Sequence, residues 1–348
     1  MPSSSLLTRP LCWLLSASVC IACGDGKHID GLQDPGPGEM STSDGDLVFS
    51  EPDDLVSDTV SGGALSVDDV WSEGLPLAID GLQWREPDVL SCLISIVDPD
   101  ISNPSSTLEK ADYAFAENEV ELGREAIFEI GALEALDVVL VLDLSRSMVA
   151  GEVVRALKSG ALGFVEALPE ASQVSVVQFA SEHALAQDFS ADREVLEDAI
   201  DALKTPEGRS GQFTNLWGAV LRAGRALSAR DANAGKAVVV FTDGLDNVAE
   251  ISEEAAVSML RDNGIMTYVV SVGEQPAPQA LSDLAGSRRN FVAEDASKLP
   301  ERFTQVAHLL SHVVKLTYET PKKSGAHTLH VDIDTGRDSG GFALKFER

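Results

Sequence analysis

Residues Asp137-Val138-Val139-Leu140-Val141-Leu142-Asp143-Leu144-Ser145-Arg146-Ser147-Met148 form an apolar run that ends in a carboxylate and two hydroxyl groups. An uninterrupted run of Val and Leu is typical of a strand that is buried on both faces of a parallel sheet. The polar groups would then lie at the carboxyl end of that strand. Ligand crevices of open α/β sheets form at this end, so we expect a binding site there.

The central part of the chain, residues 135–312, alternates apolar strands with amphipathic helices. This alternation predicts an α/β fold of the doubly wound class, with a mostly parallel central sheet and helices on both faces. Two strands, at 173–179 and 184–189, are joined too closely for a crossover helix, so we expect an antiparallel hairpin there. A second apolar strand, at 237–241, leads to another carboxylate, Asp243.

Short strand-like segments separated by turn residues lie on both sides of this central region. We expect a β-rich N-terminal flank at 86–134 and a β-rich C-terminal flank at 313–348. The two flanks could pair into one small sandwich, because chain termini often lie close together. Residues 23–85 are acidic and rich in Gly, Pro and Ser, which predicts a disordered acidic linker.

Residues 1–22 have the pattern of a signal peptide, with Arg9 before an apolar run that is too short to span a bilayer. The following segment, Cys20-Ile21-Ala22-Cys23-Gly24, resembles a bacterial lipoprotein processing site, where Cys23 would become the lipidated N-terminus. A simple secretory signal is the alternative. Either signal predicts an exported protein. The lipoprotein signal places it in the bacterial cell envelope, in the periplasm or on the cell surface.

The negative charge of the chain argues against nucleic acids as partners. Its 348 residues carry 56 acidic and 26 basic side chains, a formal net charge of −30. Nucleic-acid binding draws its affinity from Lys and Arg, so we expect no nucleic-acid partner. The same acidity disfavours an anionic membrane surface, which leaves the lipid anchor as the only expected membrane contact.

Oxygen donors converge on the expected crevice from three segments: Asp143, Ser145 and Ser147 after the first strand, Thr214 in a glycine-containing loop, and Asp243 after the second strand. Hydroxyl groups with few carboxylates suit Mg²⁺ best, and Mn²⁺ or Ca²⁺ are possible. These loops contain no Cys or His, so we do not expect zinc. A divalent cation held in this way stays under-neutralised, and it can recruit a carboxylate from another molecule.

These three segments, in this order, resemble a von Willebrand factor type A domain. The resemblance implies that Asp143, Ser145, Ser147, Thr214 and Asp243 form a metal-ion-dependent adhesion site, with the hydroxyls as direct ligands and the carboxylates direct or through water. It also implies a binding module that captures an acidic residue of a protein or peptide partner. The chain departs from the family at Arg146, where many members have Gly, and at Phe213, where a small residue is common.

An enzyme is the main alternative class. A serine nucleophile needs a base within reach, and the Gly-x-Ser-x-Gly elbow, the Walker A loop and the dinucleotide fingerprint are all absent from the sequence. We therefore expect no catalytic residues and no enzymatic activity. A metal-dependent hydrolase and a structural type A domain that does not use metal remain the alternatives.

Overall fold

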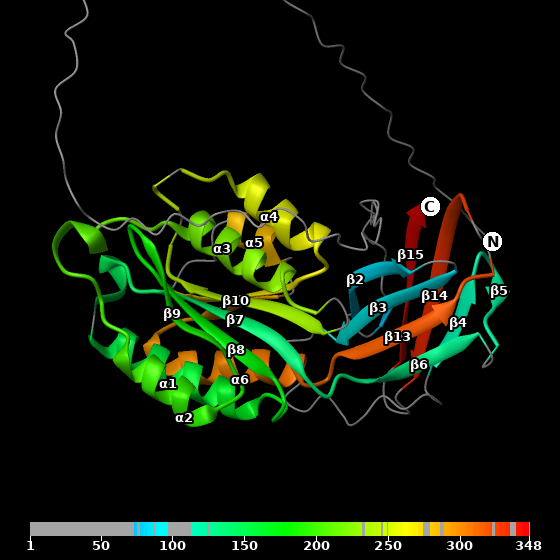
Figure 1. The fold of residues 1–348 in the computed structure, drawn as a ribbon, viewed down its shortest axis with the longest axis horizontal. Coiled ribbons are helices and arrows are strands. Elements are labelled where there is room, and N and C mark those ends of the chain that lie inside the picture. Colours follow the sequence, from blue (N-terminus) through cyan, green and yellow to red (C-terminus); the bar gives the residue numbers. More distant parts are fainter. Residues whose placement is uncertain are drawn as a thin grey trace, which may run out of the picture. The chain divides into compact units, whose positions relative to one another are not determined.

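The computed structural model describes residues 73–74, 77–85, 88–96, 113–123, 126–149, 151–231, 234–244, 246–248, 250–273, 279–285, 289–321, 324–334 and 339–347. The expected signal peptide (1–22), the expected lipidation site Cys23 and most of the expected linker (23–85) lie outside these residues. The described residues form a central α/β domain and a set of strands that flank it in sequence (Figure 1).

The central domain is built on a six-stranded sheet with the order β12-β11-β10-β7-β8-β9. All neighbouring strands are parallel except the β8–β9 hairpin, which is antiparallel as expected. Every residue of β7 and β10 is buried, because both strands lie inside the sheet and both faces are covered. The strands are β7 (Leu136–Asp143), β8 (Gln173–Phe179), β9 (His183–Ser190), β10 (Gly235–Thr242), β11 (Met266–Val272) and β12 (Asn290–Ala293).

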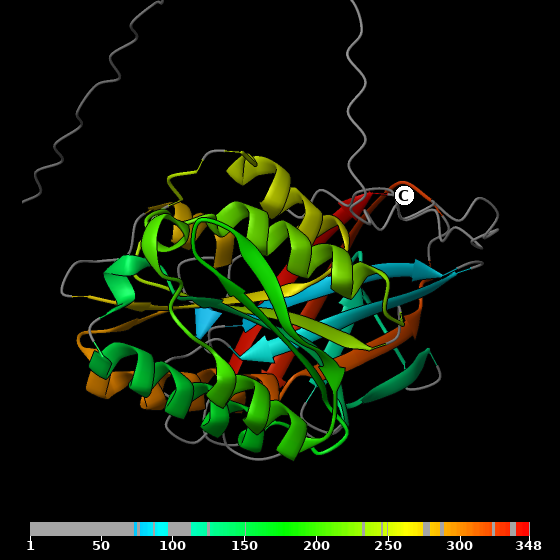
Figure 2. The ribbon, with the colours of Figure 1, turned by 60° about the vertical axis from the view of Figure 1, so that its left-hand side comes forward.

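Helices cover both faces of this sheet (Figures 1 and 2). Leu140 of β7 belongs to a core that includes Phe164 and Phe303, whereas the next residue, Val141, belongs to a second core with Val220. Successive side chains of one strand therefore pack under different helices, which confirms the doubly wound α/β fold. One face carries α1 (Gly151–Ala167), α2 (Arg193–Ala202) and α6 (Leu299–Leu310), and the other carries α3 (Leu216–Ser228), α4 (Glu253–Asp262) and α5 (Gln279–Ala285). Among the described residues, no helix is both long and apolar enough to cross a membrane.

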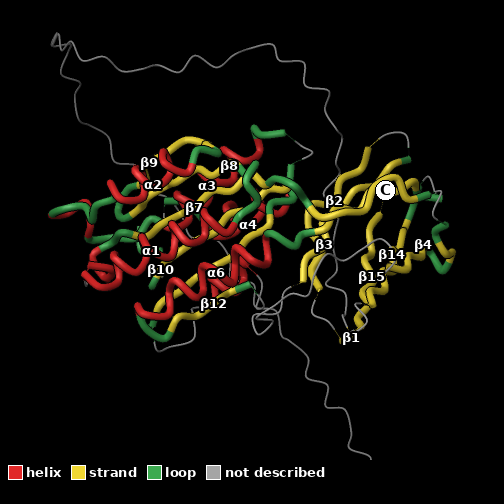
Figure 3. Tube along the Cα trace, turned by 90° about the horizontal axis from the view of Figure 1, so that it is seen from below, coloured by secondary structure: helices red, strands yellow, loops and turns green. Residues whose placement is uncertain are grey.

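The flanking segments pair with each other in two antiparallel sheets, of order β2-β3-β13-β6 and β1-β15-β14-β4-β5. Figure 3 shows these strands without accompanying helices. Ile94 and Tyr318 of the first sheet share a buried core with Phe115 and Val331 of the second, so the sheets form a sandwich. The strands are β1 (Glu73–Gly74), β2 (Leu77–Arg85), β3 (Val89–Ile96), β4 (Tyr113–Glu117), β5 (Val120–Glu121), β6 (Ile127–Ala132), β13 (Val314–Glu319), β14 (Ala326–Asp334) and β15 (Ser339–Glu347).

Strands β1 and β2 fall within residues 23–85, so the expectation of a disordered linker is wrong for these two segments. Strand β2 pairs antiparallel with β3, but the register shifts between Asp80 and Gln83. Such a bulge interrupts the apolar–polar alternation by which a sequence reveals a strand.

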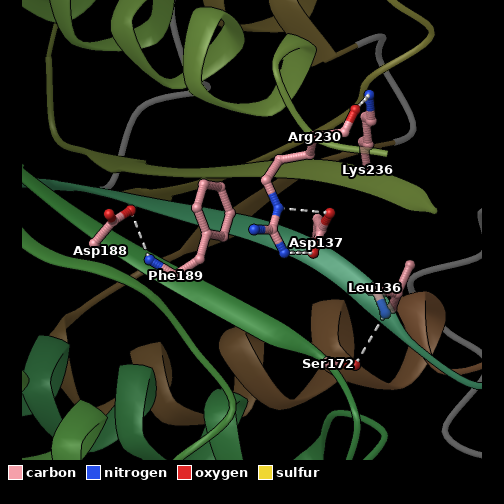
Figure 4. Close-up of polar contacts among 7 residues, drawn as sticks. All are labelled: Leu136, Asp137, Ser172, Asp188, Phe189, Arg230 and Lys236. Atoms are coloured by element: carbon pink, nitrogen blue, oxygen red, sulfur yellow. Dashed lines mark hydrogen bonds and ion pairs between the residues drawn. The ribbon is translucent and has the colours of Figure 1, made fainter. Parts of the chain in front are cut away.

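The amino end of β7 is held by one arginine (Figure 4). Arg230 donates two hydrogen bonds of 2.9 Å to the carboxylate of Asp137, and its guanidinium lies 4.5 Å from the ring centroid of Phe189 on β9. Lys236 of β10 donates to the carbonyl oxygen of Arg230 at 3.0 Å. The Asp137 side chain is only 6% exposed, so its charge is neutralised inside the fold.

We expect Arg230→Ala to lower the free energy of unfolding by about 1–3 kcal/mol. The substitution removes the ion pair and leaves the Asp137 carboxylate buried, and the estimate allows for the partial exposure of the arginine. Urea denaturation measures the change. Arg225→Ala, which removes an exposed arginine from α3, is the matched control and should stay within about 0.5 kcal/mol of the wild type. Equal losses in both variants would contradict the assigned role.

Candidate metal centre

Asp143 is the last residue of β7 and is completely buried. Its Oδ1 accepts a hydrogen bond from the backbone N–H of Ser145 at 2.8 Å, and its Oδ2 accepts one from the Thr242 hydroxyl at 2.7 Å. Both donors are neutral. Burial raises the pKa of Asp143 from 3.8 to about 6, with a smaller contribution from the nearby Asp243, and the hydrogen bonds offset part of this rise.

A chain of hydroxyl groups connects the ends of β7 and β10. The Oγ atoms of Ser145 and Ser147 lie 3.1 Å apart, and Ser147 Oγ donates to Asp243 Oδ1 at 3.0 Å. Ser145 is buried, Ser147 is exposed, and Asp243 is half-buried, which raises the pKa of its carboxyl group. The structure thus joins Asp143, Ser145, Ser147 and Asp243 by a continuous set of hydrogen bonds.

Thr214, the fifth expected ligand, is brought to the same edge of the sheet by its backbone. Its N–H donates to Asn247 Oδ1 at 2.8 Å, and the N–H of Asn247 donates back to the Thr214 carbonyl at 3.0 Å. The next residue, Asn215, bonds to the carbonyl of Ala180 at the end of β8. Thr214 is nearly buried, and within the described part of the chain its hydroxyl makes no hydrogen bond to the other four residues.

Three residues that support the site are not among the ligands expected from the sequence. Thr242 was not expected, although β7 and β10 pair in register up to Leu142 and Phe241, which places Thr242 beside Asp143. Asp246 accepts from the backbone N–H of Trp217 at 3.0 Å and so ties the loop after β10 to the first turn of α3. Asn247 holds Thr214. The register of the two apolar strands was the signal that could have identified Thr242.

The two departures from the family pattern both lie at the surface. Arg146 begins a short 3-10 helix, is exposed, and makes no ion pair with any residue that the structure describes. Phe213 is 49% exposed, and its N–H donates to Ser181 Oγ at 3.0 Å. Neither side chain belongs to the set of hydrogen bonds around Asp143.

The donor set fits a hard divalent cation. It offers two carboxylates and three hydroxyl groups, without thiol or imidazole, and such oxygen ligands match the preferences of Mg²⁺. No cluster of three or more His, Cys, Asp or Glu side chains that could hold a metal ion occurs among the described residues. Within the described residues, no cationic side chain is hydrogen-bonded to the buried carboxylate of Asp143, and a bound metal ion would supply a positive charge there.

In the metal-free protein, Asp143 should make stability depend on pH. Its pKa is about 6 in the folded chain and near 3.8 when unfolded, so its stabilising contribution is complete below about pH 4 and is lost as the pH rises through 6. Asp143→Asn cannot ionise, and at about pH 8 it should unfold with a free energy up to about 3 kcal/mol above that of the wild type. The Thr242 hydroxyl can adapt to the new amide, since the Gly244 carbonyl also lies within 3.2 Å.

Denaturant unfolding of both metal-free proteins between about pH 4 and 8 measures this effect. The difference should vanish toward the acidic end of the range. A difference that does not change with pH would show that Asp143 is not the group responsible.

The family model of the von Willebrand factor type A domain matches residues 137–306. Among solved structures, the chain is similar to proximal thread matrix protein 1 of the mussel byssus, with 20% identity over 55% of this chain and 51% of that one, at a TM-score of 0.47. A second structure of that protein is described as having a zinc-occupied MIDAS motif, at 22% identity, 54% and 49% coverage and a TM-score of 0.47.

Another similar structure is a von Willebrand factor type A protein of Catenulispora acidiphila, with 12% identity over 80% of this chain and 75% of that one, at a TM-score of 0.45. The chain spans about half the length of the mussel protein. Comparison with curated proteins finds no match. The match of the family model, on the segment that forms the doubly wound sheet, shows that residues 137–306 of this chain are a von Willebrand factor type A domain.

Proposed function

We propose that this domain captures a protein or peptide partner through a divalent cation. The ion would be held by Asp143, Ser145, Ser147, Thr214 and Asp243, and a carboxylate of the partner would complete its coordination. One observation carries the proposal: Asp143 is a fully buried carboxylate, and the hydrogen bonds that it accepts within the described residues come from neutral donors.

Asp137, at the opposite end of β7, is a buried carboxylate whose charge is neutralised within the fold, and it serves as a comparison. Asp137 is also buried, but it receives two hydrogen bonds from the guanidinium of Arg230. A buried charge is strongly unfavourable unless it is paired or bound to a metal. Within the described residues, Asp143 has hydroxyl and amide partners where Asp137 has an arginine, which supports a bound cation at Asp143.

The balance of ligands supports a binding role for that cation. Hydroxyl oxygens bring no negative charge, so two carboxylates and three hydroxyls leave a divalent ion with residual attraction for an anion. Ser147 is exposed and Asp243 is half-buried, so this side of the site is accessible from solvent. Mg²⁺ is the ion we propose, with Mn²⁺ or Ca²⁺ as alternatives. When bound, it would accept an oxygen of the partner's carboxylate.

Two observations favour binding over hydrolysis. Ser145 and Ser147 have each other and Asp243 as side-chain partners, and neither is hydrogen-bonded to a histidine in the described part of the chain. A serine hydrolase needs a base in that position. Domains of this family are also generally interaction modules. We therefore propose no enzymatic activity, with a metal-dependent hydrolase and a metal-free structural domain as the alternatives.

We further propose that the protein is exported and anchored by lipid at Cys23. The sequence supports this through the apolar segment before Cys23 and through the acidic, Gly- and Pro-rich tract after it. A self-repelling tether of this kind would hold the binding domain away from the membrane. The anchor and most of the tether lie outside the described residues.

Mg²⁺ should raise the thermal midpoint of the wild-type protein by about 5–10 °C when its concentration is about 100 times the dissociation constant, because a ligand that binds only the folded state stabilises it. Asp143→Ala should lose this shift. Asp198→Ala, which removes an exposed carboxylate on α2, should keep it. Differential scanning calorimetry with Mg²⁺, Mn²⁺, Ca²⁺ or chelator measures the shifts, and equal shifts in both variants would contradict the proposed site.

Capture from the native cell envelope should also depend on the metal. Wild-type protein should retain a partner in Mg²⁺ and release it in chelator, whereas Asp143→Ala should capture nothing in either buffer. Circular dichroism of the variant checks that its fold is intact. Retention of the partner in chelator would overturn the proposal, and turnover of ester or phosphate substrates that depends on Ser145 would favour the hydrolase alternative.

A further inference from the structure

Two exposed side chains, Arg146 and Phe213, lie directly beside the proposed ligands in sequence and take no part in the hydrogen bonds that hold the site together. Arg146 separates Ser145 from Ser147, and Phe213 precedes Thr214. Both are solvent-facing, although the residues next to them in the site are mostly buried. Each is therefore an exposed side chain within one residue of a proposed ligand.

The backbone on either side of Arg146 is held by its neighbours, and the Arg146 side chain is exposed. The backbone N–H of Ser145 is bonded to Asp143, and Met148 at the end of the same turn is fully buried. The backbone around Arg146 is thus fixed on both sides, while its side chain pairs with no carboxylate among the described residues. An arginine presents a planar fork of donors that suits a carboxylate, and one on a fixed backbone loses less freedom on binding.

The negative net charge of the chain makes a positive side chain at Arg146 useful for binding an acidic partner. An acidic partner that approaches a protein of charge −30 meets a repulsive field. The metal ion can offset this repulsion for the one carboxylate that it binds. A second carboxylate on the same partner would need its own positive charge, and Arg146 supplies one beside the site.

Phe213 is apolar where Arg146 is charged, and like Arg146 it is exposed next to a proposed ligand. It is one of four exposed large apolar residues among those described, the others being Val120, Leu185 and Val195, and it is the one that directly precedes a proposed ligand. Its backbone is tied to Ser181, and the next residue is tied to Asn247. An exposed aromatic ring on a fixed backbone is a typical anchor of a protein interface.

We propose that the partner is recognised at three points: one carboxylate on the cation, a second carboxylate on Arg146, and an apolar side chain on Phe213. This inference rests on the proposed metal-dependent capture and adds the identity of the partner segment. The segment would be a short acidic stretch with two Asp or Glu residues and an apolar residue close to them. A single isolated carboxylate would bind only weakly.

Four synthetic peptides on a common Gly-Ser backbone test this inference. The first peptide carries a single Asp, the second carries Asp and Glu, the third carries Asp and Leu, and the fourth carries Asp, Glu and Leu. One to three residues separate these side chains in each peptide. Their affinities for the full-length protein are measured by calorimetric titration in Mg²⁺ and in chelator. We expect the fourth peptide to bind at least tenfold more tightly than the first, and none to bind in chelator.

Two variants, each with a control, test which residue of the protein binds the Glu and which binds the Leu of the peptides. Arg146→Gln should weaken only the Glu-containing peptides, by about three- to tenfold, and this loss should shrink in high salt. Phe213→Ser should weaken only the Leu-containing peptides, by about five- to tenfold, with little dependence on salt. Arg225→Gln and Val195→Ser make the same chemical changes at exposed positions of α3 and α2, and both should bind like the wild type.

The outcomes separate this inference from the proposed function. If all four peptides bind equally in Mg²⁺ and are lost in chelator, metal-dependent capture stands and recognition at three points is wrong. If Arg146→Gln affects every peptide alike, the arginine acts on the metal loop and not on a second carboxylate. If no peptide binds in Mg²⁺, neither proposal holds for linear acidic segments.

Discussion

Strand β7 is buried from its first residue to its last, so its two carboxylates are removed from water and need partners inside the protein. Asp137 at one end and Asp143 at the other are both withdrawn from water. The first is neutralised by Arg230, which also contacts the edge strand through Phe189. The hydrogen bonds that the second accepts within the described residues come from a backbone N–H and a hydroxyl group, which are neutral. The two ends of one strand therefore differ: one carboxylate is paired with an arginine, and the other has neutral hydrogen-bond partners.

The parallel sheet also explains why polar residues from separate strands lie at the same edge of the sheet as Asp143. The register between β7 and β10 brings Thr242 and Asp243 to the same level as the end of β7. The end of β8 then anchors two loops, since Phe179 bonds to Leu144 and Ala180 bonds to Asn215. The oxygens are therefore positioned by strand ends, and the loops have little freedom of their own. Rigid support of this kind favours a binding site with a defined geometry.

Much of this arrangement could be predicted from the sequence, because buried parallel strands have an unmistakable apolar pattern. The runs before Asp143 and Asp243 predicted the two central strands, and the short connection at 180–183 predicted the hairpin. The sequence did not reveal Thr242, whose role depends on the register between strands distant in sequence. Strand β2 was missed because a bulge breaks its alternation. The exposed placement of Arg146 also needed the structure, since local spacing does not say where a long side chain points.

The pairing of the two flanks has a consequence for how the chain reaches its native state. Strand β6 ends at Ala132 and strand β13 begins at Val314, and these two residues are register partners although the whole type A domain separates them in sequence. Bringing them together across an unfolded chain would carry the entropy of closing a very long loop. In the folded protein the N–H of Leu133 donates to the carbonyl of Val313, directly beside the Ala132–Val314 pair, so the ends of the two flanks lie next to each other where they join the type A domain. A folded type A domain would therefore lower the entropic cost of pairing the two flanks, which couples the stability of the sandwich to that of the domain inserted in it.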